Sequence, residues 1–244
     1  MEYGYLSDIG NVRKLNEDNG GFFKNPQGLF LGLVADGIGG NQGGDVASSM
    51  VTSHLGYLFG HSKFIHPEEA YEWLQHQVQI ENDLLIRKGE KYLDLRGMGT
   101  TLVCILGNDH SCIIANIGDS RGYRYRNGKL LQITQDHSLV NELVREGALT
   151  KEEAKHSPQK NIIIRTLGIS KEAQMDRHTL NVQEDDIFLL CSDGLSKLVS
   201  DDDMMCILKQ DLDLDIKCEQ LVSLARQNGG NDNITVLLVA RKRR

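Results

Sequence analysis

The chain has 244 residues, enough for one domain with one sizeable core, and a formal net charge of −7. The acidic balance argues against a nucleic-acid-binding surface, because binding to a phosphate backbone needs a basic face and the only cluster of basic residues is 241–244. Prolines are few and no low-complexity stretch interrupts the chain, so we expect a single domain over residues 1–244 without a long linker.

Hydrophobic patterns predict strands that are joined by tight turns and interrupted by helices. In chain order the expected elements are a strand at 28–35, helices at 45–59 and 67–88, strands at 100–106, 111–117, 121–126 and 129–134, a helix at 138–146, a strand at 186–191, helices at 201–209 and 215–227, and a strand at 233–240. Asn127-Gly128 predicts a two-residue type I′ hairpin turn, which needs positive φ at both positions. This order indicates an α+β protein whose antiparallel sheets are covered by helices.

Cysteine usage and hydropathy indicate a cytoplasmic protein. The five cysteines are odd in number, form no Cys-x-x-Cys pair and mostly lie in apolar runs, where a thiol packs as a small hydrophobe. The N-terminus lacks the basic and apolar regions of a signal peptide, and no apolar segment approaches the ~18 residues that a membrane span requires. We therefore expect a reducing compartment and no membrane association.

Four aspartates lie next to predicted strands. Asp36, Asp119 and Asp193 each follow a strand within a few residues, whereas Asp232 precedes one. If that last strand runs antiparallel to the others, all four carboxylates meet at one edge. Each aspartate taken singly has a plain alternative explanation, because Asp-Gly is common in turns. Four carboxylates at one edge would repel each other unless a cation lay between them.

The residues around these aspartates indicate which kind of cation would bind. Each aspartate has glycine or a small polar residue beside it, in the segments DGIGG, GDSRG, SDGLS and GGNDNIT. No cluster of His or Cys lies near them in the sequence. Carboxylate and carbonyl oxygens are ligands for hard cations, so the sequence predicts Mg²⁺ or Mn²⁺ rather than Zn²⁺ or copper.

The glycine-rich stretch VADGIGGNQGG, residues 34–44, does not fit the phosphate-binding loops of nucleotide-binding proteins. The Rossmann spacing fails at Gln42, where the third glycine belongs, and the Walker spacing is followed by Asp45 rather than Lys. A carboxylate at that position would repel the anion that such a loop binds. The sequence therefore argues against a nucleotide-binding loop.

Eight short motifs along the chain together resemble one family. In order they are SDIGNVRKLNEDN (7–19), VADGIGGNQGGDVAS (34–48), MGTTLV (98–103), NIGDSRGY (116–123), ITQDHS (133–138), RTLG (165–168), CSDGLS (191–196) and GGNDNIT (229–235). Each motif alone is weak, but all eight in this order are specific. They resemble the metal-dependent protein phosphatases, the PPM or type 2C serine/threonine phosphatase family, in its short bacterial form.

The resemblance implies a four-layer αββα sandwich of two antiparallel sheets flanked by helices, with a two-metal centre at one edge. It implies that Asp36 bridges the two Mn²⁺ or Mg²⁺ ions and that Gly37 offers its backbone carbonyl to one of them. Asp193 and Asp232 resemble the remaining direct ligands. A catalytic role follows by the same resemblance for Arg13, Asp36 and Asp193.

Further residues gain roles by the same resemblance. Glu17 and Asp18 would contact the metal ions through water, and Asp119 with Asp193 would hold a third and weaker ion. Arg13 resembles the arginine that binds the substrate phosphate, although a surface ion pair with Glu17 or Asp18 is an alternative role for it.

The activity implied is hydrolysis of phosphoserine and phosphothreonine in proteins by a water that two metal ions activate. The resemblance also implies a monomer that opposes a Hanks-type serine/threonine kinase in bacterial signalling. It would dephosphorylate the kinase and the substrates of that kinase. A phosphoprotein-binding pseudophosphatase is the second hypothesis. The intact ligand set argues against it, because a degenerate relative usually lacks one of those acids. Hydrolysis of small phosphoesters is a third.

Three features leave questions open. Ile38 stands where many eukaryotic relatives carry a histidine proposed as general acid, and isoleucine cannot donate a proton. His137, between a strand and a helix start, is expected to be a structural residue with satisfied hydrogen bonds. Residues 144–168, with His156, resemble the mobile flap of the family, but an ordinary helix-loop connection explains them equally well.

Overall fold

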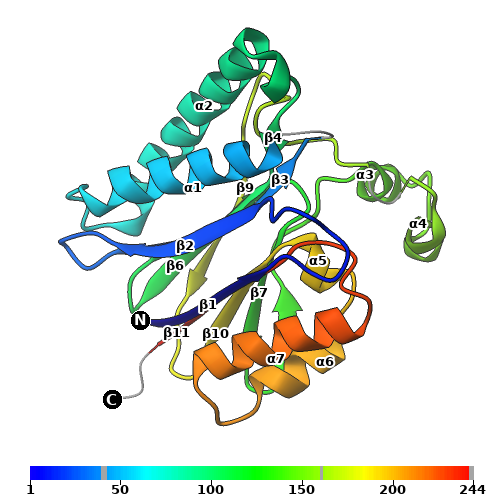
Figure 1. Ribbon diagram of the computed structural model, residues 1–244. Helices are drawn as coiled ribbons and strands as arrows, with labels where there is room; N and C mark the ends of the chain where they lie inside the picture. Colours follow the sequence, from blue (N-terminus) through cyan, green and yellow to red (C-terminus); the bar gives the residue numbers. More distant parts are fainter. Residues whose placement is uncertain (40–42, 160–161, 242–244) are drawn as a thin grey trace.

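The computed structural model describes residues 1–39, 43–159 and 162–241. Two antiparallel sheets stack face to face (Figure 1). One sheet contains, in spatial order, β1 (Glu2–Asp8), β11 (Ile234–Ala240), β10 (Ile187–Cys191), β7 (Arg121–Arg126) and β8 (Lys129–Gln132). The other contains β2 (Asp18–Lys24), β3 (Phe30–Ile38), β5 (Leu102–Gly107), β6 (Ser111–Ile117) and β9 (Asp176–Asn181), and β4 (Gly99–Thr100) pairs with the end of β3.

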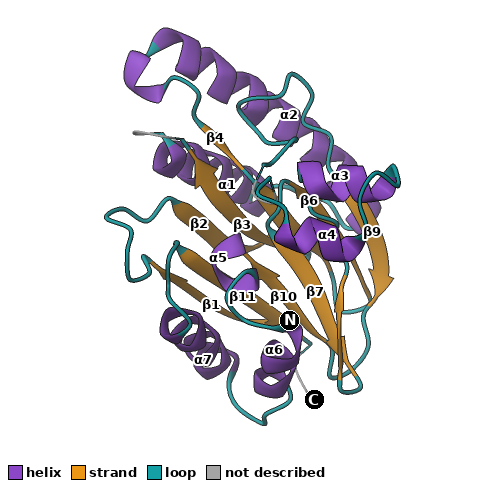
Figure 2. Ribbon diagram, turned by 90° about the vertical axis from the view of Figure 1, so that its right-hand side faces the viewer, coloured by secondary structure: helices purple, strands orange, loops and turns teal. Residues whose placement is uncertain are grey.

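Helices cover the outer face of each sheet (Figures 1 and 2). On the β2 to β9 sheet lie α1 (Gly44–Gly60) and α2 (Pro67–Lys91), which is followed by a short 3₁₀ turn at Leu93–Leu95. On the β1 to β8 sheet lie α6 (Asp201–Leu208) and α7 (Leu214–Gln227), and α5 (Asp193–Ser196) is a single turn after β10. The predicted αββα sandwich is confirmed.

Strand β3 shows why the chain contains continuous apolar runs. Leu31 and Leu33 point into the core beneath α1 and α2, whereas Phe30 and Val34 point into the core between the two sheets. A strand in the middle of a sandwich is buried on both faces, so it shows no alternation of apolar and polar residues. Packing on both faces therefore fixes the position of β3, and the last residues of this strand reach the edge of the sandwich.

The structure confirms most of the predicted elements with small shifts at their ends. Asn127 and Gly128 have φ values of 51° and 74°, as the type I′ turn requires. One correction concerns Asp36, which lies inside β3 and not after it, because the pairing of Gly37 and Ile38 with β4 extends the strand. The strand expected at 129–134 ends earlier, at Gln132.

Two short helices, α3 (Leu139–Arg145) and α4 (Lys151–His156), lie to one side of the sandwich (Figure 1). The side chain of Ser138 caps α3 by accepting a hydrogen bond from Asn141 N, and Thr150 with Glu153 forms a capping box at the start of α4. The end of α3 and the whole of α4 lie in the segment predicted to be a flap, residues 144–168. Residues 160–161 and the side chain of His156, which belong to that prediction, lie outside the described part.

Gln42 of the glycine-rich stretch and the last three residues of the basic tail, 242–244, also lie outside the described residues. None of the helices in the described part of the chain combines the length and the apolar character that crossing a membrane requires.

Candidate active site

Strands β2 and β3 bring two of the predicted site segments together. Asp18 and Asp36 lie directly opposite each other in the antiparallel register of these strands. The main-chain N–H of Gly37 donates to the carbonyl oxygen of Glu17 at 3.1 Å. The segments that carry Glu17, Asp18, Asp36 and Gly37 therefore lie side by side at one edge of the sandwich.

Asp193 and Asp232 come from the neighbouring strands β10 and β11 of the other sheet. Asp193 begins α5, and Asp232 comes shortly before β11. The two segments approach so closely that an added Cβ on Gly194 would lie 2.0 Å from the main-chain oxygen of Asn233 and 3.5 Å from Cβ of Asp232. Glycine at position 194 is therefore required for this approach, which places Asp193 beside Asp232 as the sequence predicts.

A buried serine joins the two sheets at this edge. Ser192 Oγ donates a hydrogen bond to Asp18 Oδ2 at 2.7 Å and accepts one from Thr235 N at 3.0 Å. Asp18 belongs to β2 in one sheet, whereas Thr235 belongs to β11 in the other and Ser192 directly follows β10 of that second sheet. The sequence analysis does not find Ser192, because only the three-dimensional structure shows that its hydroxyl contacts a residue so distant in the chain.

Two threonines hold the main chain of Asp36. Its carbonyl oxygen accepts hydrogen bonds from Thr100 Oγ1 and Thr101 N at 2.9 Å each, and its N–H donates to Thr101 Oγ1 at 3.0 Å. Thr101 Oγ1 also lies 2.7 Å from Ser120 Oγ, next to Asp119. The hydrogen bonds that Asp36 makes with described residues thus involve its main-chain atoms. Through Thr101 and Ser120 they fix Asp36 relative to the turn that carries Asp119.

Gly37 has a packing reason to be glycine. An added Cβ would lie 2.2 Å from the main-chain oxygen of Gly44 at the start of α1 and 2.6 Å from that of Glu17. A Cβ added to Gly44 would in turn lie 2.6 Å from Glu17 Oε1. Any side chain at either position would separate β3, α1 and the Glu17 segment, so the glycines in this motif allow close packing.

We call Asp18, Asp36, Asp119, Asp193 and Asp232 together the carboxylate edge. Burial raises the pKa of Asp18 to about 7 and that of Asp119 to about 6, with further contributions from neighbouring aspartates. It raises the pKa of Asp36 well above the ordinary value, and the negative charges of the other four members raise it further. The carboxylates around Asp36 therefore oppose its ionisation, and this arrangement favours a bound cation.

The donor atoms fit an oxygen-binding cation that keeps water ligands. The Asp119 Oδ1 atom is buried without a hydrogen-bond partner among the described residues. No group of three or more His, Cys, Asp or Glu side chains in the described ranges is arranged to hold an ion by itself. The carboxylate oxygens gathered at this edge are ligands that suit Mg²⁺ or Mn²⁺ better than Zn²⁺.

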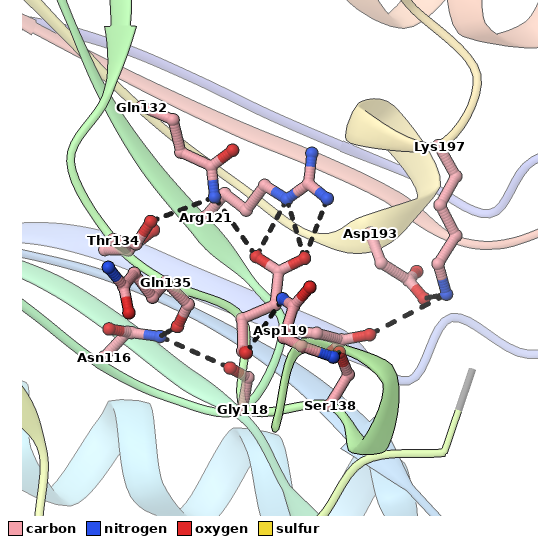
Figure 3. A network of polar contacts seen from close by, with 12 residues as sticks. Asn116, Gly118, Asp119, Arg121, Gln132, Thr134, Gln135, Ser138, Asp193 and Lys197 are labelled. Carbon is pink, nitrogen blue, oxygen red and sulfur yellow. Dashed lines mark hydrogen bonds and ion pairs between the residues drawn. The ribbon is translucent and has the colours of Figure 1, made fainter. Parts of the chain in front are cut away.

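Two basic side chains reach the carboxylate edge. Arg13 Nη2 donates to Asp232 Oδ2 at 2.8 Å, and both side chains are partly exposed. Arg13 thus forms an ion pair with Asp232. The alternative role for Arg13 assumed a pair with Glu17 or Asp18 instead. Lys197 Nζ forms an ion pair with Asp193 and lies 3.7 Å from Asp119 Oδ2 (Figure 3). Burial lowers the pKa of Lys197, but the two aspartates raise it on balance.

The sequence analysis does not identify Lys197. It lies four residues after Asp193, a spacing at which side chains meet on one face of a helix, and this spacing is the available signal. The short helix α5 realises it, since Lys197 N donates to Asp193 O at 2.9 Å.

A cleft of about 750 Å³ adjoins the carboxylate edge between α5 and the α3–α4 segment. Asp119, Asp193 and Asp232 line one part of it, and apolar side chains of α3 and α4 line another. Arg121 also lines it and forms a two-pronged ion pair with Asp136, with Nη2 at 2.7 Å from Oδ2 and Nε at 2.9 Å from Oδ1 (Figure 3).

His137 has a partner at both ring nitrogens. Gly118 N donates to Nδ1 at 3.1 Å, and Nε2 lies 3.1 Å from Asp176 Oδ2. Its contacts are those expected of a structural histidine that holds the turn before Asp119. Ile38 lies at the end of β3 opposite Gly99, which leaves its position without a proton donor.

Comparisons with known proteins agree with this arrangement. A family model described as protein phosphatase 2C matches residues 11–236. A Listeria welshimeri protein named serine/threonine phosphatase stp is 42% identical over 242 residues, covering 99% of this chain and 96% of the relative. The protein phosphatase PhpP of Streptococcus pneumoniae is 40% identical over 240 residues, covering 98% of this chain and 97% of the relative.

Among solved structures, the S. agalactiae serine/threonine phosphatase aligns with a TM-score of 0.95 at 38% sequence identity over 99% of both chains. The likeness thus extends over both sheets and the segments that meet at the carboxylate edge. The chain belongs to the protein phosphatase 2C family.

Proposed function

We propose that the carboxylate edge holds two Mn²⁺ or Mg²⁺ ions and that this centre hydrolyses phosphoserine and phosphothreonine in proteins. The protein phosphatase 2C family depends on divalent metal ions in general, and similar chains are named serine/threonine phosphatases. The chain is accordingly a phosphoprotein phosphatase. The observation that carries the proposal for this site is that four other carboxylates act on Asp36, an arrangement that favours bound cations.

Each side chain has a distinct role in this proposal. Asp36 would be shared by the two ions, Gly37 would contribute its carbonyl oxygen, and Asp193 and Asp232 would be direct ligands. Bound divalent ions supply positive charge that lowers the pKa of an attacking water and stabilises charge that develops on the phosphoryl group.

The remaining residues act around these ligands. Glu17 and Asp18 hold water at the site, and the hydrogen bond from Ser192 orients the Asp18 carboxylate for this purpose. Asp119, together with Asp193, is the place for a third and weaker ion. Arg13 binds two phosphate oxygens through its planar guanidinium once it leaves Asp232.

The partners follow from the same chemistry. Phosphorylated proteins are the substrates, and a Hanks-type serine/threonine kinase with its targets is the opposing system. We place the protein in the cytoplasm as a monomer, with residues 1–244 as one catalytic domain. Residues 144–168 serve as the flap, and the position of Val144 and Ala154 beside the cleft supports a part in substrate choice.

The test is hydrolysis of p-nitrophenyl phosphate and of a phosphothreonine peptide, with Mn²⁺ and with EDTA. The wild type is expected to hydrolyse both substrates only with Mn²⁺, and Asp193→Asn is expected to be inactive on both. Activity that survives chelation would contradict a metal-dependent reaction. Binding of the phosphopeptide without turnover by the Mn²⁺-loaded wild type would support a pseudophosphatase instead.

A further inference from the structure

Lys197 is held at the carboxylate edge by the helix turn that also carries Asp193. Its main-chain N–H donates to the carbonyl oxygen of Asp193 at 2.9 Å, so the two side chains leave the same face of α5. The Lys197 ammonium forms an ion pair with the Asp193 carboxylate. The side chain of Lys197 is 43% exposed, and its ammonium group lies beside Asp193 and Asp119 (Figure 3).

Asp119 depends on the same ammonium. Its side chain is 8% exposed, and its Oδ2 atom lies 3.7 Å from Lys197 Nζ. Its Oδ1 atom is buried and has no hydrogen-bond partner among the described residues. Within the described part of the chain, Lys197 is the basic side chain that forms an ion pair with Asp119. One ammonium therefore stands between two carboxylates of the site.

We propose that Lys197 is a tethered cation that occupies the position between Asp119 and Asp193 and so weakens the binding of a third divalent ion to this pair. This inference rests on the proposed metal centre, and it adds a determinant of how many ions the centre holds. A compact ammonium and a divalent ion compete for the same carboxylate oxygens, so an ion can bind there only when Lys197 moves away. The other basic residue at the edge, Arg13, pairs with Asp232 and leaves this position to Lys197.

The proposal gives Lys197 a different role from that of an ordinary surface ion pair. Exposed pairs at this spacing contribute little to stability, and their loss changes no binding site. A tethered counter-ion has two effects that such a pair lacks. It reduces repulsion between Asp119 and Asp193 in the metal-free protein, and it excludes a competing ion from them.

Two measurements without substrate test the proposal. Electron paramagnetic resonance of free Mn²⁺ gives the number and affinity of bound ions, and thermal unfolding in EDTA gives the stability of the metal-free protein. In Lys197→Met the third ion is expected to bind about tenfold more tightly than in the wild type, because one opposing charge is gone. The same variant is expected to unfold at a lower temperature in EDTA.

Matched variants make the result specific. Lys197→Arg keeps the charge and is expected to bind Mn²⁺ like the wild type. Lys209→Met removes an exposed lysine at the end of α6 and controls for the change in net charge. In the double variant Lys197→Met, Asp119→Asn the tighter third ion is expected to disappear, which locates it at this pair.

The possible failures are distinguishable. If wild-type protein binds no Mn²⁺ at all, the proposed metal centre is wrong. If the wild type binds two ions tightly and Lys197→Met binds a third no more tightly than the wild type does, the metal centre stands and the role of Lys197 is overturned. A tighter third ion in Lys209→Met would also overturn it, since the effect would then follow net charge.

Discussion

Asp18 and Asp36 lie directly opposite each other across the β2–β3 pair, so two adjacent strands place two carboxylates at one point of the edge. This register explains why β3, which is otherwise largely apolar, carries an aspartate near its end. The backbone position is fixed by the ladder and by the two threonines that bind the Asp36 main chain. The side chain is then available for a ligand.

Asp36→Asn tests the consequence of this arrangement. The variant is expected to lose more than about 100-fold in kcat with Mn²⁺, beyond the loss typical of a residue that only supports a ligand. In EDTA at pH 8 it is expected to unfold at a temperature about 3 °C higher than the wild type. The folded-state pKa of Asp36 is raised, so its ionised form destabilises the metal-free fold above that pKa, and an uncharged amide removes this effect.

Activity assays with Mn²⁺ check the expected loss of kcat, and thermal unfolding in EDTA checks the expected gain in stability. The exposed residue Asp94 offers a control, and Asp94→Asn is expected to change neither activity nor stability by much. An Asp36→Asn protein that is less stable than the wild type in EDTA would show that Asp36 supports the fold and is not strained by its neighbours.

Arg13→Ala tests the arginine at the rim. The variant is expected to raise KM for a phosphothreonine peptide by a factor that corresponds to ~1.5–3 kcal/mol, the usual worth of a charged hydrogen bond. Lys14→Ala removes an adjacent exposed cation and is the control. If the ion pair with Asp232 is the only role of Arg13, KM stays unchanged and the variant differs from the wild type in Mn²⁺ affinity alone.

The positions of Asp36, Asp193 and Asp232 could be predicted from the sequence, because the strands beside them are buried on both faces. Such strands appear as continuous apolar runs, and an aspartate at the end of a run is conspicuous. The roles of the other site residues could be predicted only from the resemblance to the family. Arg13, Glu17 and Gly37 have no pattern of their own that indicates a role.

The strands β1, β2 and β9 could not be predicted, because they are partly exposed and their apolar positions are few. Strand β2, which contains Gly20 and Gly21, carries Asp18, so the register that pairs Asp18 with Asp36 was out of reach as well. The contacts of Ser192 with Asp18 and of Lys197 with Asp119 join segments far apart in the chain. Local patterns do not contain this information.

Ile38 leads to a prediction about leaving groups. Without a proton donor at this position, the departing oxygen receives little help, so rates are expected to fall steeply as the leaving group becomes more basic. A phosphoserine peptide should therefore react more slowly than p-nitrophenyl phosphate, and its pH–rate profile should differ. Measurement of kcat for a series of aryl phosphates and for the peptide checks this. Identical pH–rate profiles for the peptide and the aryl phosphate would contradict it.

His137 gives the fold a predictable dependence on pH. Burial lowers the pKa of His137, and the nearby Arg165 cation lowers it further, whereas Asp176 opposes both. Protonation of Nδ1 would also remove the hydrogen bond that Gly118 N donates to it. The folded protein therefore binds a proton at His137 less readily than the unfolded chain, whose histidine has a pKa of about 6.5.

The sign of the effect follows from this difference. A group with a lowered folded-state pKa contributes stability that is complete above the unfolded pKa and is lost as pH falls through the folded pKa. The free energy of unfolding of the wild type is thus expected to fall between about pH 7 and pH 5. In His137→Asn the amide oxygen can still accept from Gly118, but nothing titrates in this range.

Urea denaturation in EDTA at a series of pH values measures the difference between the two proteins. The carboxylate edge titrates in both proteins, so subtracting the two stability profiles removes most of its contribution and leaves that of His137. The wild type should lose stability relative to His137→Asn as the pH falls. Burial acts to raise the pKa of Asp176, but its hydrogen bonds with His137 and Arg165 lower that pKa on balance, so part of the difference is expected to continue below about pH 4, where an aspartate of the unfolded chain becomes protonated. Parallel profiles would mean that His137 is as readily protonated in the folded protein as in the unfolded chain.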